Sequence, residues 1–338
     1  MNPNSNRTSE VDEFWRQSSD PLVSVIVITY NSSKYVLETL ESAKAQTYNN
    51  IELIITDDGS MDTTVKICEE WLSENKERFM AAKCITVENN TGIAPNINRG
   101  LKEAKGEWIK FIAGDDILMD TCIERNINFV KNSPHSFFFS KMKFTKKREN
   151  LANHFNKGFQ LLKTKKNHLR IILRKCFVPA PSAFIRREAL VHLGGFDERF
   201  PMMEDYPLWV KAAQNNYFFI CNDEPTVIYR IHDEGIVLRE NWGTKKDLYS
   251  GLPFRQSSYF FMRKVLLNEQ LKNYLFLRAW DTMIQIIQFK VLVSIPENKR
   301  HSVSQPVYRI FQLLRPSYYY KLMNRINKKL FELVLTAL

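Results

Sequence analysis

Apolar runs and amphipathic segments alternate along the first 120 residues. Four runs rich in β-branched and other apolar side chains have the length of strands, at 23–29, 51–56, 84–87 and 108–113. Amphipathic segments at 34–46 and 94–104, and one that begins after Asp62, separate them. Continuous apolar runs of this length indicate buried strands, and their alternation with helices predicts an α/β fold with a mainly parallel sheet covered on both faces.

The pattern changes toward the C-terminus. A short aromatic strand is expected at 137–139 and an amphipathic helix at 206–215, whereas helical periodicity dominates at 257–295 and 307–338. We therefore expect three regions: a loose arm at 1–20, an α/β domain at 21–250 and a basic helical region at 251–338. Within the α/β domain, residues 21–140 and 141–250 would form two halves.

Polar clusters follow three of the predicted strands. They are Thr29-Tyr30-Asn31, Asp57-Asp58 and Asp115-Asp116. Ligands of parallel sheets bind at the carboxyl ends of the strands, so these clusters predict a binding site at one edge. Glu204 and Asp205 form another acidic pair, directly before the helix at 206–215.

Composition and targeting signals narrow the class of protein. The hydrophobic fraction of 44% and charged fraction of 25% are ordinary for a globular protein. The five cysteines are widely spaced without a Cys-x-x-Cys pair, which fits reduced thiols better than a metal or redox site. The first twenty residues lack the apolar core of a secretory signal, so we expect a cytoplasmic protein.

The net charge of +11 is concentrated in two basic blocks. Residues 140–175 carry twelve Lys or Arg against Glu149 alone, and 296–338 carry eight against Glu297 and Glu332. Such blocks favour an anionic partner, although a solvated basic face explains either block equally well. The C-terminal segment also has apolar positions, at Ile310, Phe311, Leu313, Leu314, Leu322, Ile326 and Leu330. A basic amphipathic helix of this kind could lie on the inner face of an anionic cytoplasmic membrane or pack on the catalytic domain, and periodicity does not separate the two.

Several motifs, taken in order, resemble those of the family 2 glycosyltransferases, which have the GT-A fold. They are VSVIVITYN (23–31), QTYNNIELIITDDGSMDTT (46–64), NNTGIAPNINRGLKEAKGEWIKFIAGDDIL (89–118), GGFDERF (194–200), MMEDYPLWVKAA (202–213) and YRIH (229–232). The resemblance extends over about two thirds of the chain, and its specificity lies in the order and spacing of the motifs together.

The resemblance implies a role for each matching position. It places nucleotide binding at Tyr30 and Asp58, flanked by Thr29 and Asn31, and it adds Asn98 to the donor-binding residues. The family's metal-binding acidic motif corresponds to Asp115 and Asp116, with Ala113 where its first acid would stand, and the resemblance leaves open which of the two is the ligand. Arg230 and His232 correspond to donor-phosphate contacts, and Ile97 stands where many relatives have an arginine. Asp205 corresponds to the catalytic base of inverting members, with Glu204 beside it.

The chemistry of glycosyl transfer suits these groups. Mg²⁺ or Mn²⁺ prefers oxygen ligands and needs only one or two carboxylates when a diphosphate supplies the others. A carboxylate near the acceptor hydroxyl can take its proton, and a single in-line displacement inverts the anomeric centre. Each assignment also has a structural alternative: Asp57-Asp58 as a turn, Asp115-Asp116 as a helix cap, Glu204-Asp205 as a helix start, and Arg230 and His232 as structural side chains.

We therefore expect an inverting, metal-dependent glycosyltransferase. It would move a sugar from a nucleotide diphosphate sugar, with UDP favoured, to a glycan or polyprenyl-diphosphate-linked saccharide in O-antigen, capsule or other surface polysaccharide (lipopolysaccharide) synthesis. A dinucleotide-dependent oxidoreductase is disfavoured because no glycine follows the first strand between Thr29 and Lys34. A non-catalytic protein that binds nucleic acid or membrane remains an alternative on charge alone, but no nucleic-acid-binding motif supports a nucleic acid partner.

Overall fold

The computed structural model describes residues 20–131, 133–146, 149–164, 167–174, 176–232, 252–296 and 300–316. It divides the chain into two compact units. The first, here the sheet unit, comprises Met1–Ile172 and Cys176–His232, and the second, the helical unit, comprises Leu173–Lys175 and Asp233–Leu338. Most of the expected N-terminal arm and the C-terminal positions Leu322, Ile326 and Leu330 lie outside the described residues.

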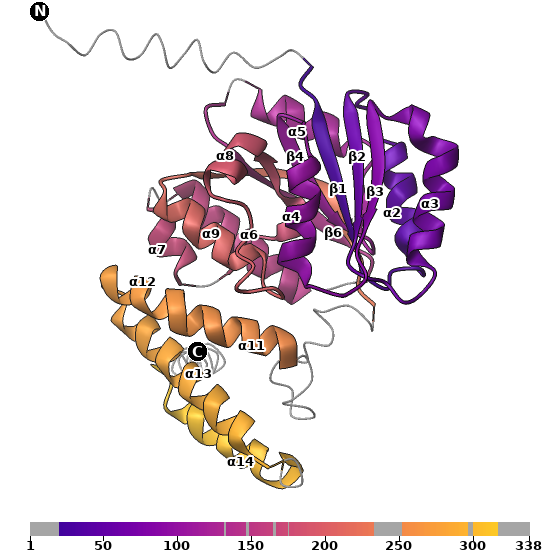
Figure 1. Cartoon of the computed structure of the whole chain (residues 1–338). Coiled ribbons are helices and arrows are strands. Elements are labelled where there is room, and N and C mark those ends of the chain that lie inside the picture. The colour runs from indigo at the N-terminus through magenta and orange to yellow at the C-terminus, as the bar shows by residue number, and fades with distance from the viewer. Residues whose placement is uncertain are drawn as a thin grey trace, which may run out of the picture. The chain divides into compact units, whose positions relative to one another are not determined.

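One eight-stranded sheet organises the sheet unit, in the order β3-β2-β1-β4-β7-β6-β8-β5 (Figure 1). Its strands are β1 (Val23–Thr29), β2 (Ile51–Asp57), β3 (Ala81–Thr86), β4 (Trp108–Ala113), β5 (Ile117–Leu118), β6 (Phe137–Phe144), β7 (Phe184–Arg186) and β8 (Phe219–Tyr229). The first four in this spatial order run parallel, as the alternating pattern predicts. The remaining strands make the sheet mixed, because β7 is antiparallel to both of its neighbours and β5 is antiparallel to β8.

Helices connect the strands of the sheet unit. They are α2 (Val36–Lys44), α3 (Thr64–Asn75), η1 (Lys76–Arg78), α4 (Ile93–Glu103), α5 (Cys122–Val130), α6 (Glu149–Thr164), α7 (His168–Ile172), η2 (Ala180–Ser182), α8 (Arg187–His192) and α9 (Asp205–Gln214). The strands and helices predicted in the first 120 residues all form, with ends shifted by at most a few residues.

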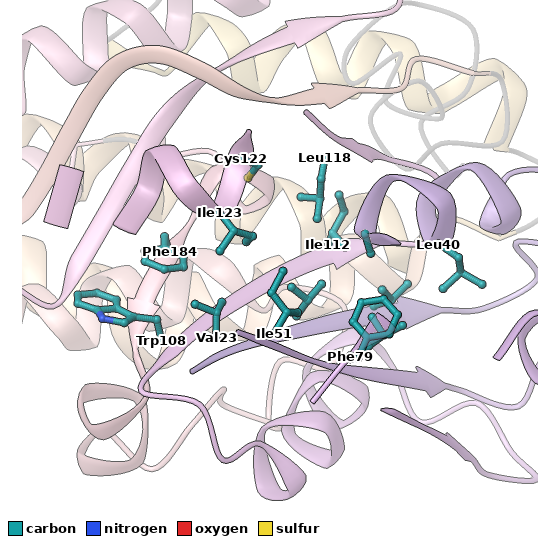
Figure 2. Close-up of a cluster of buried hydrophobic side chains, with 14 of the residues drawn as sticks. Val23, Leu40, Ile51, Phe79, Trp108, Ile112, Leu118, Cys122, Ile123 and Phe184 are labelled. Atoms are coloured by element: carbon teal, nitrogen blue, oxygen red, sulfur yellow. The ribbon is translucent and has the colours of Figure 1, made fainter. Parts of the chain in front are cut away.

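Alternation along the central strands divides their side chains between two faces. Val23, Val25 and Val27 of β1 belong to a buried cluster with residues of α2, α3 and α5 (Figure 2). Ile26 points to the opposite face, where its side chain lies against Gly100 of α4 so closely that a Cβ at position 100 would approach it to 2.5 Å. Both faces of the parallel strands are therefore covered, which explains why these runs are apolar at every position.

The helical unit consists of helices at the C-terminal end of the described chain. They are α11 (Leu252–Phe261), a π-helical turn η3 (Met262–Leu266), α12 (Leu267–Lys272), α13 (Phe276–Ser294) and α14 (Arg300–Leu313). The helical periodicity predicted at 257–295 is thus divided at residues 273–275. No helix in the described residues is both long enough and apolar enough to cross a bilayer.

Candidate active site

Three strand ends meet at one edge of the sheet. β1 lies between β2 and β4, with Thr29 opposite Asp57 and Ile28 opposite Ala113. The parallel register therefore brings together the three polar clusters that follow these strands. Asp58 confirms the proximity, since its backbone N–H donates to the carbonyl of Thr29 at 3.0 Å.

Asp58 is buried and accepts four hydrogen bonds from protein groups. One carboxylate oxygen accepts from the Thr91 hydroxyl at 2.7 Å and from the Arg99 guanidinium at 2.5 Å. The other oxygen accepts the backbone N–H groups of Thr91 at 2.9 Å and Gly92 at 2.7 Å. Asp58 thus fixes the loop that enters α4, and this structural task accompanies the nucleotide-binding role that the family resemblance gives it.

The loop after β1 is held by the loop after β2. Asn31 has a left-handed backbone with φ 49°, and its side chain accepts the N–H of Met61 at 2.9 Å while its own N–H donates to the Ser60 hydroxyl at 2.8 Å. Thr29 is buried and donates its hydroxyl to Asp57 at 2.8 Å. Tyr30, between them, is 45% exposed. Of the three predicted residues, Thr29 is therefore buried, whereas Tyr30 and Asn31 are exposed.

Residues at the C-terminal end of β8 contact Asp115 and Asp116, the acidic pair that follows β4. His232 Nε2 lies 2.9 Å from Asp115 Oδ2, and Arg230 donates from its Nε to the Asp115 carbonyl at 2.8 Å. The backbone N–H of Arg230 donates to Asp116 Oδ1 at 2.8 Å. The short antiparallel pairing of β5 with β8 produces this meeting, because it aligns Ile117 with Ile228. Residues more than a hundred positions apart thereby form one cluster.

Tyr35 and Glu38, which the sequence analysis did not identify, complete this cluster. The Arg230 guanidinium lies 4.9 Å from the centre of the Tyr35 ring and donates to Glu38 at 2.5 Å. The Tyr35 and His232 rings are 4.6 Å apart between centroids. The spacing of three residues places Tyr35 and Glu38 on one side of the first turn of α2, directly after the β1 loop, and that spacing was the available signal.

Asp115 and Asp116 differ in accessibility. Asp116 is buried, and burial together with the charge of Asp115 raises the pKa of its carboxyl well above the usual value. The Asp115 side chain is partly exposed and bonded to His232, whose Nδ1 is buried without a hydrogen-bond partner. Of the two acids, Asp115 is therefore the better placed to meet a ligand.

The cluster suits a cation that shares its ligands with a substrate. In the described residues no group of three or more His, Cys, Asp or Glu side chains forms a ready-made metal site. Mg²⁺ commonly takes one or two carboxylates, several waters and the oxygens of a bound diphosphate. Asp115, whose Oδ2 lies 2.9 Å from His232 Nε2, fits that smaller contribution.

The loop that precedes the second acidic pair, Glu204 and Asp205, contacts the start of α4. Gly92, at the start of α4, has φ 105°, and a Cβ there would lie 2.6 Å from Pro201 Cβ. The Ala94 N–H donates to the Pro201 carbonyl at 3.1 Å. Gly92 thus contacts both Asp58 and the loop that leads to Glu204 and Asp205. These contacts connect Asp58, at the end of β2, to the loop before Glu204 and Asp205.

Glu204 and Asp205 lie at the N-terminus of α9. Burial and then the charge of Asp205 raise the pKa of Glu204 to about 8. Burial also raises the pKa of Asp205, opposed by hydrogen bonds from the Tyr206 N–H at 2.6 Å and from the Cys176 thiol, whose Sγ is 3.7 Å away. Burial therefore raises the pKa of both carboxyls, and a carboxylate of raised proton affinity suits general base catalysis. No feature of the sequence indicated that Cys176 would lie here.

The side chains of Asn98 and Ile97 are engaged in contacts within the protein. The Asn98 side chain donates to the Phe196 carbonyl at 2.9 Å and to Glu198 at 2.8 Å, and it accepts the Phe196 N–H at 2.9 Å. Ile97 is buried. Asn98 thus anchors the loop before Pro201, and its donor-binding role stays a prediction. At position 97, where many relatives have an arginine, this chain places an apolar side chain in the core.

The first basic block is partly neutralised at the surface. Asp223 of β8 pairs with Lys141 at 3.2 Å and also with Lys163. Several members of the block, including Lys147, Arg148 and Lys165, lie outside the described residues.

Comparison with known proteins agrees with this arrangement. The sequence pattern described as "Glycosyl transferase family 2" matches residues 24–194, just over half of the chain. An uncharacterized glycosyltransferase of Rickettsia typhi is 28% identical over 232 residues, 63% of this chain and 65% of the relative. Two further Rickettsia relatives are covered over 27% and 32% of their length, so the chain spans less than two thirds of these three relatives.

A relative of defined activity is the Escherichia coli protein WfaP, named a UDP-Glc:alpha-D-GlcNAc-diphosphoundecaprenol beta-1,3-glucosyltransferase. It is 29% identical over 213 residues, 62% of this chain and 78% of WfaP. Among solved structures, S. aureus TarS in complex with UDP-GlcNAc superposes with a TM-score of 0.56 at 20% identity, covering 87% of this chain and 82% of TarS. The mannosyltransferase PcManGT from Pyrobaculum calidifontis, in complex with GDP-Man and Mn²⁺, gives 0.53 at 15% identity, covering 91% and 92%. At these identities the structures support the fold, and the expected GT-A fold is confirmed.

Proposed function

The chain belongs to glycosyl transferase family 2, and from that premise we propose that it moves a sugar from a nucleotide diphosphate sugar to a saccharide hydroxyl with inversion. The observation that carries this proposal is the convergence of Asp115, Arg230 and His232 beside the ends of β1 and β2. The Arg230 guanidinium and the His232 imidazole, next to a partly exposed carboxylate, can receive a diphosphate and a cation together.

The donor would lie across the carboxyl ends of the parallel strands. Tyr30, exposed at the end of β1, would stack on the base, while Asp58 and the loop it fixes would contact the ribose. Thr29 and Asn31 would hold the loop that carries Tyr30. We propose UDP as the nucleotide, since WfaP is named for UDP-Glc and TarS was solved with UDP-GlcNAc, although PcManGT was solved with GDP-Man.

Metal dependence would rest on Asp115. A divalent cation there would offset the charge that develops on the leaving diphosphate. Asp115 would be the ligand and His232 its neighbour, whereas Asp116, buried beneath, would orient the β8 end through the Arg230 N–H. Arg230 is held in place by Tyr35 and Glu38, so its guanidinium keeps a fixed position beside the phosphates. The Mn²⁺ in the PcManGT complex supports this proposal.

Asp205 would be the general base. It would take the proton of the acceptor hydroxyl as the hydroxyl oxygen attacks the anomeric carbon and the bond to the diphosphate breaks. Glu204 beside it raises the proton affinity of the pair, because two adjacent carboxylates resist ionising together. One displacement without a covalent intermediate inverts the anomeric centre. An α-linked donor should therefore give a β-linked product by NMR, and an α-linked product would contradict the assignment.

The acceptor would be a glycan or a polyprenyl-diphosphate-linked saccharide in surface polysaccharide synthesis. The name of WfaP, which specifies a GlcNAc-diphosphoundecaprenol acceptor, supports this class. Residues 21–140 would then hold the donor and residues 141–250 the acceptor. An acceptor of this kind would bring the protein to the cytoplasmic face of the membrane.

Calorimetric titration of UDP with and without Mn²⁺ tests the donor site. Wild type should bind UDP more tightly with Mn²⁺, and Asp115→Asn should lose most of that metal-dependent gain. Asp116→Asn should retain more of it, because Asp116 is buried and bonded to the Arg230 N–H. GDP and dTDP in parallel titrations separate a wrong nucleotide from a wrong site. Equal weakening by both variants would contradict the assignment of Asp115 as the ligand.

A further inference from the structure

The long helix α13 exposes several of its large apolar residues. Phe276, Trp280, Met283 and Ile287 are between 40% and 62% exposed. Their spacing of four, three and four residues places them on one side of the helix, where they form a continuous strip along about three turns. We call these four residues the α13 strip. Soluble helices ordinarily turn such a strip toward a core.

The opposite side of α13 buries polar groups. Asp281, Thr282 and Gln288 are among its buried residues. The Thr282 hydroxyl donates to Gln270 of α12 at 2.7 Å, and Asp281 faces Arg315 at 3.5 Å. These contacts fix the rotation of the helix about its axis. Turning the α13 strip inward would break these contacts and would expose the buried apolar residues Ile284, Ile286 and Leu292. The strip therefore faces outward.

The strip continues onto the end of α14. Trp280 donates from its indole nitrogen to the Leu314 carbonyl at 3.2 Å, which ties the strip to the residues that follow α14. Ile310, Leu313 and Leu314 are also exposed there. An apolar surface with contributions from two helices is larger than the isolated exposed side chains that soluble proteins tolerate singly.

The charged side chains described in the helical unit are mainly cationic. Of the described side chains in 256–316, seven are Lys or Arg: Arg263, Lys264, Lys272, Arg278, Lys290, Arg309 and Arg315. The two acids, Glu269 and Asp281, are each paired with a cation, Lys272 and Arg315 respectively. Arg278 and Lys290 are exposed on α13 itself, near the two ends of the strip. A partner that matches this surface therefore combines an apolar region, which would contact the strip, with an anionic region, which would contact the Lys and Arg side chains.

We propose that the α13 strip docks on an anionic lipid bilayer surface, with α13 lying in the plane of the interface. Aromatic side chains at headgroup depth, aliphatic side chains below and Lys or Arg toward the phosphates match that layered chemistry. The contact is peripheral, in keeping with the lack of a membrane-crossing helix in the described residues. It places the membrane contact on α13, upstream of much of the C-terminal segment indicated by the sequence. It is independent of the proposed reaction, since no donor or acceptor takes part in it.

Co-sedimentation of the full chain with vesicles of phosphatidylglycerol and phosphatidylcholine tests the proposal. Wild type should bind these vesicles, bind pure phosphatidylcholine more weakly, and lose affinity as salt rises. The variant Phe276→Ser/Met283→Gln/Ile287→Gln should bind at least about tenfold more weakly than wild type, because three large apolar side chains no longer enter the lipid. A matched variant of exposed apolar residues in the sheet unit, Met61→Gln/Met80→Gln/Val191→Ser, should bind as wild type does.

Trp280 provides a second measurement that does not need the triple variant to fold. Trp71, Trp108 and Trp209 are buried, so bromine-labelled lipids should quench Trp280 in preference to them. The quenching should fall in Trp280→Phe. Wild-type binding by the triple variant, or binding lost instead in Leu322→Gln/Ile326→Gln/Leu330→Gln, would overturn the proposal. The proposal would also be overturned if wild type does not bind vesicles but forms a dimer in sedimentation velocity that dissociates only in the triple variant. The strip would then join two copies of the chain.

Discussion

β1 of the sheet unit and α13 of the helical unit use the same kinds of side chain in opposite ways. In β1 the apolar residues Val23, Val25 and Ile26 are fully buried, and Thr29 is bonded to Asp57 at the strand end. In α13 the apolar residues Phe276 and Trp280 are exposed, while the buried side combines apolar residues such as Ile284 with polar residues such as Asp281. The sheet unit therefore completes its own core around a polar edge, whereas α13 leaves its apolar face for a partner.

On these proposals, the sheet unit carries out catalysis and the helical unit binds the membrane. Every residue proposed for donor, metal or base lies in the sheet unit, between Thr29 and His232. The basic and apolar surface of α13 belongs to the helical unit. If the assignment is right, substitutions in the two units should separate catalysis and core stability from vesicle binding. The following substitutions test that separation, beginning with the largest effect.

Asp205→Asn should lower kcat on the order of a thousandfold, because removal of a general base typically costs 10² to 10⁴ in rate. Product formation from a radiolabelled nucleotide sugar measures it. Asp223→Asn, which removes a surface acid paired with Lys141 and Lys163, is the control and should stay near wild type. Retention of activity by Asp205→Asn together with its loss in Glu204→Gln would transfer the base role to Glu204.

Ile26→Ala should destabilise the sheet unit by about 3 to 4 kcal/mol, since the deletion leaves a cavity beneath Gly100 where the structure has little room to relax. Ile287→Ala should change stability by less than about 0.5 kcal/mol, because this isoleucine is exposed on α13. Urea unfolding measures both. Similar losses for the two variants would mean that the α13 strip is covered in the free protein, contrary to the comparison.

Asp58→Ala should cost about 2 to 3 kcal/mol, because it leaves Arg99 and two backbone N–H groups without their acceptor. Asp281→Ala in the helical unit should cost less, about 1 to 2 kcal/mol, because Asp281 is buried but its contact with Arg315 is long at 3.5 Å. Thermal unfolding ranks the two. A larger loss for Asp281→Ala would show that polar contacts stabilise the helical unit more than the sheet edge.

Glu204 should make the free energy of unfolding depend on pH, in the direction set by its raised pKa. Its folded pKa of about 8 exceeds the ordinary value of 4.5, so the folded protein binds the proton more tightly between those values. Stability should therefore fall as pH rises from about 4.5 to about 8. Glu204→Gln should flatten this part of the profile, as differential scanning calorimetry can show. A wild-type profile that rises over the same interval and is unchanged in the variant would contradict the raised pKa.

The sequence predicted the sheet unit better than the helical unit for a physical reason. Strands such as 23–29 are buried on both faces, so their apolar character is unmistakable and their limits follow from it. In β7, three residues long, and in β5, two residues long, the pattern is too short to register. The segment 257–295 was predicted as helical, but its break at 273–275 depends on packing between α12 and α13.

The sequence by itself determined the order of strands and helices in the first 120 residues, the polar groups at three strand ends and, through motif order, the family. Each depends on neighbours in the chain or on parallel register. Tertiary structure decided that Asp116 is buried while Asp115 is accessible, that Tyr35 and Glu38 join Arg230, and that α13 faces outward. These outcomes depend on contacts between residues far apart in the chain, such as Asp115 with His232, and hydrophobic periodicity carries no information about which distant partner a side chain meets.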